Sequence, residues 1–226
     1  IIGGTSTTSI NYLGAFEQCR GLQSVEIPPD ASLSTVGARS FRCCVSLTCV
    51  TLPPTADYIG PRCFMRCEAL ESVCITGAVK TISQMAFYAC RALTRVSLGR
   101  HTRSIKQSSF EKCTRLEHID LQTTQLKSIY AKAFASCLRL QTITFPVCAE
   151  IDFSFRSFYN CSALTDVWLP HKVTYMDART FEGCRNLKTV VANRVSTFVA
   201  DSIPPSFNGT RQPGVIIIAP CDACDT

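Results

Sequence analysis

A phenylalanine returns along this chain with a period of about 23 residues, and other residues keep fixed distances from it. The eight members of this column are Phe16, Phe41, Phe64, Phe87, Phe110, Phe134, Phe158 and Phe181. A cysteine follows three residues after each phenylalanine, a leucine six residues after it, and a valine or isoleucine nine residues after it. A further apolar slot lies two positions beyond that, and a small residue precedes each phenylalanine. This agreement across eight units indicates an internal repeat.

Each unit contains one segment with the periodicity of a β-strand. Val96 and Leu98 are two residues apart, so both side chains lie on one face of a strand and the intervening residue on the other. A unit of this length cannot bury its own apolar face, so neighbouring units stack around a shared core. The strands are then parallel and about 4.8 Å apart. Turns follow directly at Pro28, Pro53, Pro146 and Pro170.

The motif Phe-x-x-Cys-x-x-Leu-x-x-Ile-x-Leu-Pro, preceded by Ile-x-x-x-small, resembles the BspA-like (treponemal-type) leucine-rich repeat. The resemblance covers roughly residues 10–192. It implies an α/β-type repeat solenoid with one strand plus turns or short helical segments per coil. It further implies a curved, right-handed shape with a parallel sheet on the concave face. Members of the family occur on bacterial and protist surfaces or act in adhesion, and the resemblance implies no catalytic residues.

We expect residues 1–226 to form a single solenoid, with eight clear repeats over about 10–192 and a degenerate ninth unit over 193–220. The first 15 residues fit the unit poorly, and Phe207 begins an irregular unit without the cysteine and leucine slots. These ends read as caps, or as the edges of a piece excised from a longer chain. No secretory signal is visible at Ile1, and no apolar run is long enough to span a bilayer.

Eight of the fifteen cysteines occupy one slot of the repeat. They are Cys19, Cys44, Cys67, Cys90, Cys113, Cys137, Cys161 and Cys184. Side chains stacked in one column point the same way, which disfavours disulfides, so we predict a ladder of buried, reduced thiols. A serine in this ladder is expected to bury a hydroxyl without a partner.

The compartment stays open from the sequence. The odd cysteine count and the ladder thiols suit a reducing compartment, whereas the family resemblance allows the cell surface. Sequons at Asn160 and Asn208 matter only if the chain enters a secretory route.

No catalytic or cofactor motif stands out in the sequence. There is no Gly-x-Ser-x-Gly elbow, no phosphate-binding Gly-x-x-x-x-Gly-Lys loop and no His-Glu-x-x-His pair. Cys221-x-x-Cys224 has the spacing of a metal or redox site, but no second such pair exists. We therefore predict no enzymatic activity, no cofactor and no metal.

Trp168 is the single tryptophan of the chain, and the strand register turns it outward because Val167 and Leu169 must face the core. We expect it to be substantially exposed in the isolated chain, as the anchor of an interface. The alternative is that it folds over a sheet edge or contacts a neighbouring domain. The binding residues predicted on this strand face are Trp168, Asp166, Asp120, His118, Arg95 and Glu71.

Charge is distributed unevenly between the strand face and the turns. The chain has a formal net charge of +6, yet the strand face carries five acidic residues against two basic ones. The excess of positive charge therefore lies near the phenylalanine turns. A basic rim is predicted at Arg91, Arg115, Arg139, Arg156 and Arg179. This rim is either simply solvated or a contact for a polyanion such as a glycan or RNA.

We predict a non-enzymatic module that binds a protein through the concave strand face or the basic rim. A structural scaffold subunit of a larger assembly is the alternative from another class, and polyanion binding through the rim is a third. The sequence leaves the oligomeric state and the partner's identity open.

Overall fold

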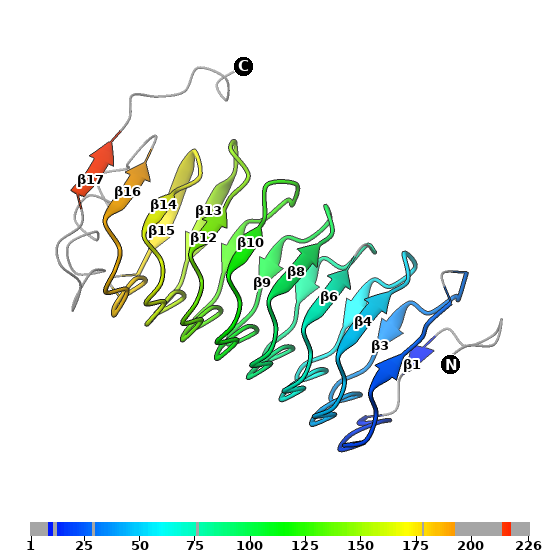
Figure 1. Cartoon of the computed structure of the whole chain (residues 1–226). Helices are drawn as coiled ribbons and strands as arrows, with labels where there is room; N and C mark the ends of the chain where they lie inside the picture. The colour runs from blue at the N-terminus through cyan, green and yellow to red at the C-terminus, as the bar shows by residue number, and fades with distance from the viewer. Residues whose placement is uncertain are drawn as a thin grey trace.

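The computed structural model describes residues 9–10, 13–28, 30–75, 77–177, 179–192 and 214–217 of the chain. These residues form a solenoid whose coils stack one behind another from the N-terminus to the C-terminus (Figure 1). Each coil carries one phenylalanine of the repeat, so the coils are numbered from coil 1 at Phe16 to coil 8 at Phe181. The cysteine pair Cys221 and Cys224, Asn208 and most of the predicted ninth unit lie outside the described residues.

Two walls of parallel strands enclose the core, and each coil contributes a strand to both walls. The first wall holds the Val/Ile-x-Leu pairs. It consists of a six-stranded sheet, β2 (Ser24–Val25), β4 (Cys49–Leu52), β6 (Ser72–Ile75), β8 (Arg95–Leu98), β10 (His118–Asp120) and β12 (Thr142–Thr144), and a three-stranded sheet, β14 (Asp166–Trp168), β16 (Thr189–Ala192) and β17 (Gly214–Ile217). We call its outward surface the strand face.

The opposite wall is one eight-stranded parallel sheet. Its strands are β1 (Ser9–Ile10), β3 (Thr35–Val36), β5 (Tyr58–Ile59), β7 (Thr81–Ile82), β9 (Ser104–Ile105), β11 (Ser128–Ile129), β13 (Glu150–Phe153) and β15 (Lys172–Met176). The strand-plus-turn solenoid predicted from the sequence is confirmed. The described residues contain no helix, so turns alone connect the two walls. The second sheet was not predicted.

The turn around each phenylalanine alternates between two backbone conformations. Residues two before and two after the phenylalanine adopt positive φ, as at Arg62 with φ 57° and Arg66 with φ 61°. Their amides donate to the next coil, Arg62 N–H to Gln84 O at 2.9 Å and Arg66 N–H to Tyr88 O at 2.8 Å. The phenylalanine between them also donates to the next coil, Phe64 N–H to Ala86 O at 2.8 Å, whereas its two direct neighbours donate within their own coil. A positive φ costs most residues energy, and here inter-coil hydrogen bonds offset that cost.

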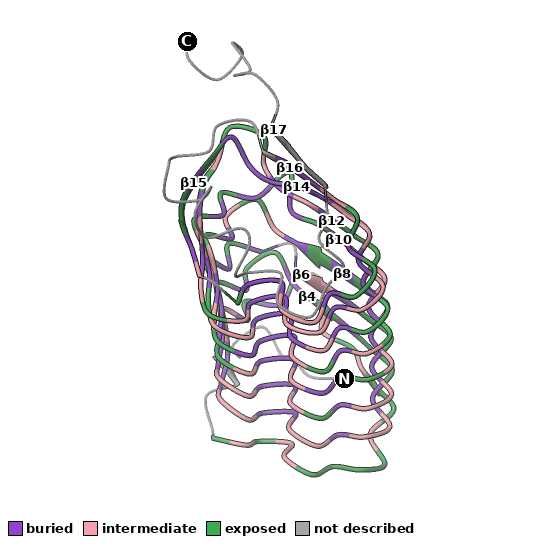
Figure 2. Ribbon diagram, turned by 90° about the vertical axis from the view of Figure 1, so that its left-hand side faces the viewer, coloured by how far each residue is buried: buried purple, intermediate pink, exposed green. Residues whose placement is uncertain are grey.

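Two columns of identical side chains form the centre of the core. Neighbouring phenylalanine rings from Phe16 to Phe181 are stacked, with centroids 5.2–5.4 Å apart and planes within 12°. The ladder cysteines from Cys44 to Cys184 are fully buried free thiols, whereas Cys19 in the first coil is exposed. The ladder prediction is therefore confirmed except at Cys19. Figure 2 shows that buried segments align from coil to coil.

Each ladder thiol also has a hydrogen-bond acceptor, contrary to the sequence expectation. The Sγ of Cys67 donates to the Phe41 carbonyl at 3.0 Å, and that of Cys113 donates to the Phe87 carbonyl at 3.2 Å. The same bond to the preceding coil recurs from Cys44 to Cys184. The slot thus joins neighbouring coils, and a polar group placed there would find an acceptor. Outside the ladder, Cys148 is disulfide-bonded.

The first wall is interrupted between coils 6 and 7. Among the described residues, β12 and β14 form no ladder, and they belong to separate sheets. Leu121 N–H donates to Thr144 O and Leu169 N–H to Val191 O, but the equivalent bond from Phe145 N–H to Trp168 O is not made. We call this interruption the β12–β14 break.

Phe145 gives a physical reason for the break. It fills the slot that holds isoleucine or leucine in coils 1–5 and 7, and it packs edge-on against Phe153 and Phe158, with centroids 5.4 and 6.5 Å away. Phe153 itself occupies a slot that is valine or isoleucine in coils 2–5. The added ring volume pushes the first wall apart locally, because close-packed cores cannot absorb it. On the opposite wall, β11 of coil 6 and β13 of coil 7 stay paired, and a register shift occurs between β13 and β15.

Candidate functional site

Trp168 projects from the strand face as the sequence predicted. Val167 is fully buried and Leu169 is 6% exposed, while Trp168 between them is 57% exposed. Its strand β14 is fixed by pairing with β16, where Trp168 lies opposite Val191. The expected exposure is confirmed, and the indole is held on a hydrogen-bonded sheet rather than on a loop.

A pocket of about 300 Å³ opens beside the indole. We call it the Trp168 pocket. Its lining includes Trp168, Val147, Thr144, Gln122, Phe145 and Pro170. Val147 is 58% exposed, so two large apolar side chains face solvent at this one place. Exposed apolar groups around a concavity are typical of interaction sites.

The Trp168 pocket lies at the β12–β14 break. Residues of coil 6, including Thr144 and Phe145, form one side, and residues of coil 7, including Trp168 and Pro170, form the other. Phe145 N–H has no protein acceptor among the described residues. The break therefore leaves one residue of the pocket lining with a backbone donor that the corresponding residues Leu121 and Leu169 satisfy within the solenoid.

Two further predicted residues lie near this pocket and are held in place. The Asp120 carboxylate accepts hydrogen bonds from the Thr144 hydroxyl at 2.6 Å and from the backbone N–H of Gln122 at 3.0 Å. Both of those partners line the pocket. His118 Nδ1 lies 2.7 Å from the Thr142 hydroxyl on the adjacent strand. The hydrogen bonds reduce the conformational freedom of these side chains before any partner binds.

The remaining predicted face residues are spread along the solenoid. Asp166 shares strand β14 with Trp168 and is half-buried. Arg95 is exposed on β8 in coil 4, and Glu71 precedes β6 in coil 3. Trp168 stands in coil 7, so Arg95 and Glu71 lie three and four coils away. The structure places Asp166 on the strand of Trp168 and joins Asp120 to two residues of the pocket lining, whereas His118 contacts Thr142, which is not in that lining.

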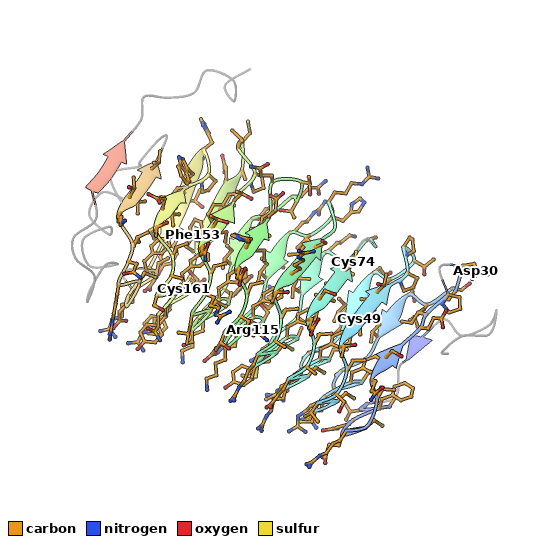
Figure 3. All side chains as sticks on the ribbon, viewed as in Figure 1. Asp30, Cys49, Cys74, Arg115, Phe153 and Cys161 are labelled. Atoms are coloured by element: carbon orange, nitrogen blue, oxygen red, sulfur yellow. The ribbon has the colours of Figure 1, made fainter. Side chains whose placement is uncertain are left out.

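The arginines of the basic rim have unequal surroundings. The Arg156 guanidinium makes two hydrogen bonds to Glu182, at 2.8 and 3.3 Å, and lies over the rings of Phe155 and Tyr159. Arg139 is 3.9 Å from Glu117. Arg91, Arg115 and Arg179 are exposed and form no ion pair among the described residues. Figure 3 shows Arg115 at the turn edge of the solenoid.

A wider depression of about 830 Å³ lies on the opposite wall, next to β11, β13 and β15. Its acidic groups already have partners. The Lys172 ammonium is 2.8 Å from Glu150 and lowers the pKa of that carboxyl, and the Thr174 hydroxyl donates to Asp152. The lining of this depression also lacks an aromatic side chain, so the smaller Trp168 pocket is the better candidate site for a protein partner.

The ladder thiols from Cys44 to Cys161 are poor nucleophiles in the folded chain. Burial raises the pKa of Cys44 to about 11 and raises those of Cys67 and Cys113 further. Only the thiolate is nucleophilic, so these groups stay inert near neutral pH. Cys49 is exposed and Cys74 half-buried, on the neighbouring strands β4 and β6 (Figure 3).

Two negative findings concern the part of the chain that the structure describes. It holds no group of three or more histidine, cysteine or acidic side chains suited to a metal ion. It also holds no helix with the length and apolar character needed to cross a membrane.

Sequence reasoning missed Val147, Gln122 and Pro170 as neighbours of the indole. They follow the strand in turns of variable length, where the repeat no longer fixes the register. The available signal was Val147, which follows Pro146 and is an apolar residue outside every slot of the repeat.

Comparisons with known proteins agree with this architecture. The family model described as BspA type leucine rich repeat region matches residues 4–102 and 80–203, in six copies. The solved structure of a leucine-rich repeat protein from Bacteroides ovatus is similar, with 23% identity, a TM-score of 0.60, and coverage of 93% of this chain and 66% of that chain. The Treponema pallidum leucine-rich repeat protein gives 23% identity and a TM-score of 0.52, over 85% of this chain and 86% of that one. No curated protein matches the sequence significantly.

Proposed function

Because this chain belongs to the BspA-type leucine-rich repeat family, whose members are generally non-enzymatic and interaction-related, we propose that it is a protein-recognition module. It binds its partner through the strand face around Trp168. The observation that carries this proposal is a tryptophan that is 57% exposed on a paired strand, beside a pocket of about 300 Å³.

Rigidity supports this function. The indole sits on a strand whose backbone is fixed by β16, so binding orders little additional chain. Tryptophan offers large contact area at low entropic cost, and residues of this type dominate measured binding energies at interfaces.

The test is affinity capture with the wild-type chain, with Trp168→Ala and with Tyr58→Ala. Tyr58 is 45% exposed on β5 of the opposite wall, so its variant is a matched control for losing an exposed aromatic ring. We expect a specific partner to be retained by Tyr58→Ala and lost with Trp168→Ala. Photo-crosslinking from position 144 should then join the same partner. Equal retention by both variants would contradict the proposal.

Polyanion binding through the basic rim is a second candidate, favoured by the exposed and unpaired Arg91 and Arg115. If the rim binds a polyanion, retention on heparin should weaken steeply with salt, since counterion release supplies the affinity. Arg91→Ala with Arg115→Ala should reduce the elution salt concentration, whereas Trp168→Ala should not. If heparin does not retain the chain at low salt, the rim does not bind a polyanion and is simply solvated.

A further inference from the structure

We propose that the Trp168 pocket takes one large apolar side chain of a partner protein, flanked in the partner by basic residues that lie over Asp120 and Asp166. This inference rests on the proposed function and specifies the partner's chemistry. The occupant is a peptide segment in which a leucine, isoleucine, methionine or phenylalanine adjoins lysine or arginine.

The lining of the pocket favours an apolar occupant over a sugar or another polar ligand. Val147, Phe145 and Pro170 contribute hydrocarbon, and the indole forms one wall. Of the polar lining side chains, the Thr144 hydroxyl already donates to Asp120, which leaves the Gln122 carboxamide and the indole N–H. A sugar needs several converging hydrogen bonds, more than these two groups supply. The volume of about 300 Å³ lies at the small end for ligand sites and suits a single side chain.

Charge around the pocket favours a basic partner segment. Asp120 accepts two hydrogen bonds but has no cationic partner among the described residues, and Asp166 likewise forms no ion pair there. The strand face as a whole is acidic although the chain has a net charge of +6. Lys188 in the next coil is the nearby exception. Complementary charge of this kind sets specificity and association rate more than affinity.

The unused backbone donor favours a peptide. Phe145, one of the residues that line the pocket, has a backbone N–H without a protein acceptor among the described residues. A buried amide that lacks a partner is costly, and a peptide carbonyl or a water molecule satisfies it. A partner peptide supplies such a carbonyl next to the inserted side chain.

The probe is a phage-displayed library of random dodecapeptides, selected on the full chain. We expect enriched sequences to share a large apolar residue next to lysine or arginine. Synthetic versions should lose roughly tenfold or more in affinity with Trp168→Ala and with Gln122→Tyr, which fills the pocket from its exposed rim. Tyr58→Ala should bind as the wild type does.

The role of charge is tested with the double variant Asp120→Asn and Asp166→Asn. Asparagine keeps the acceptor oxygen that Asp120 presents to Thr144 and Gln122. This double variant should weaken binding about threefold or more at low salt and flatten its salt dependence. Glu26→Gln removes the same kind of charge from coil 1, at the far end of the strand face, and should have no effect.

The outcomes separate this inference from the proposed function. Selected peptides could lose binding to Trp168→Ala yet lack basic residues and bind the double variant as tightly as the wild type. This result would agree with recognition through the strand face but would contradict a basic partner segment. Peptides that bind Trp168→Ala as tightly as the wild type would overturn both. A library that yields no binder to the wild-type chain would contradict a pocket that captures a peptide side chain.

Discussion

The ladder cysteine of coils 2–8 combines two roles that serine or alanine would fill only in part. Its sulfur packs in a fully buried column, and its S–H donates to the phenylalanine carbonyl of the preceding coil. The sequence predicted the buried column from the repeat alone. It could not predict the acceptor, because the bond depends on how far one coil is displaced along the axis relative to the next.

This bond makes a testable difference between two substitutions of Cys113. Cys113→Ser keeps a side-chain donor near the Phe87 carbonyl, whereas Cys113→Ala leaves that carbonyl with the Cys90 N–H as its donor. We expect the Cys113→Ser variant to be no less stable than the Cys113→Ala variant in urea unfolding. If the hydroxyl had no acceptor, serine would be less stable by about 1 kcal/mol or more. Native alkylation of Cys113 should be slow in the wild type.

Trp168 provides its own reporter because it is the single tryptophan of the chain. With 57% of its surface exposed, its emission should lie near that of a solvated indole, and acrylamide should quench it strongly. A bound partner should shift the emission to shorter wavelength and protect the ring. A blue-shifted emission that resists quenching in the isolated chain would contradict an exposed indole.

A strand could be predicted from the sequence only where it contains more than one apolar slot of the repeat. The first wall has two inward slots per strand, so alternation identified it and placed Trp168 outward. The opposite wall has mostly two-residue strands with a single inward slot, such as Thr81–Ile82. One apolar residue carries no periodicity, so that sheet could not be recognised. The β12–β14 break was equally hidden, because Phe145 reads as one more apolar residue.

The turns hold a strained backbone that one substitution can relieve. Ser136 has φ 59° at the slot where coil 8 has Gly183 with φ 80°. Ser136→Gly removes the Cβ clash but gains freedom in the unfolded chain, so we expect a net stabilisation of about 0.5 kcal/mol. Ser136→Val should cost about 2 kcal/mol, since branched residues tolerate positive φ poorly. Denaturant midpoints for the two variants give the comparison.

The whole molecule behaves as a one-dimensional stack in which each coil contacts its neighbours. The repeated thiols therefore act together on its stability. Burial raises the pKa of Cys44 to about 11, and those of Cys67, Cys113 and Cys161 rise further. In the unfolded chain a thiol titrates near pH 8.5, so only the unfolded state ionises just above that pH.

The sign of the pH dependence follows from these raised pKa values. Below about pH 8.5 both states are protonated and the full stability is present. Above it, the free energy of unfolding should fall by up to about 1.4 kcal/mol per pH unit for each buried thiol whose pKa is raised. Urea titrations between pH 8 and 10 measure the slope. Cys113→Ala should reduce the slope by the contribution of one thiol. An unchanged slope would contradict the raised pKa of Cys113 as a cause of the pH dependence.

The β12–β14 break gives the stack an uneven mechanical joint. Coils 6 and 7 remain connected on one side through β11 and β13, while the ladder on the other side is interrupted. Bending compliance should concentrate at this joint, with β11 and β13 as the pivot and the two blocks of coils as levers. The Trp168 pocket lies on the side that opens. A small angular deflection of the solenoid would therefore change the width of the pocket, so a partner that grips both blocks would also set their angle.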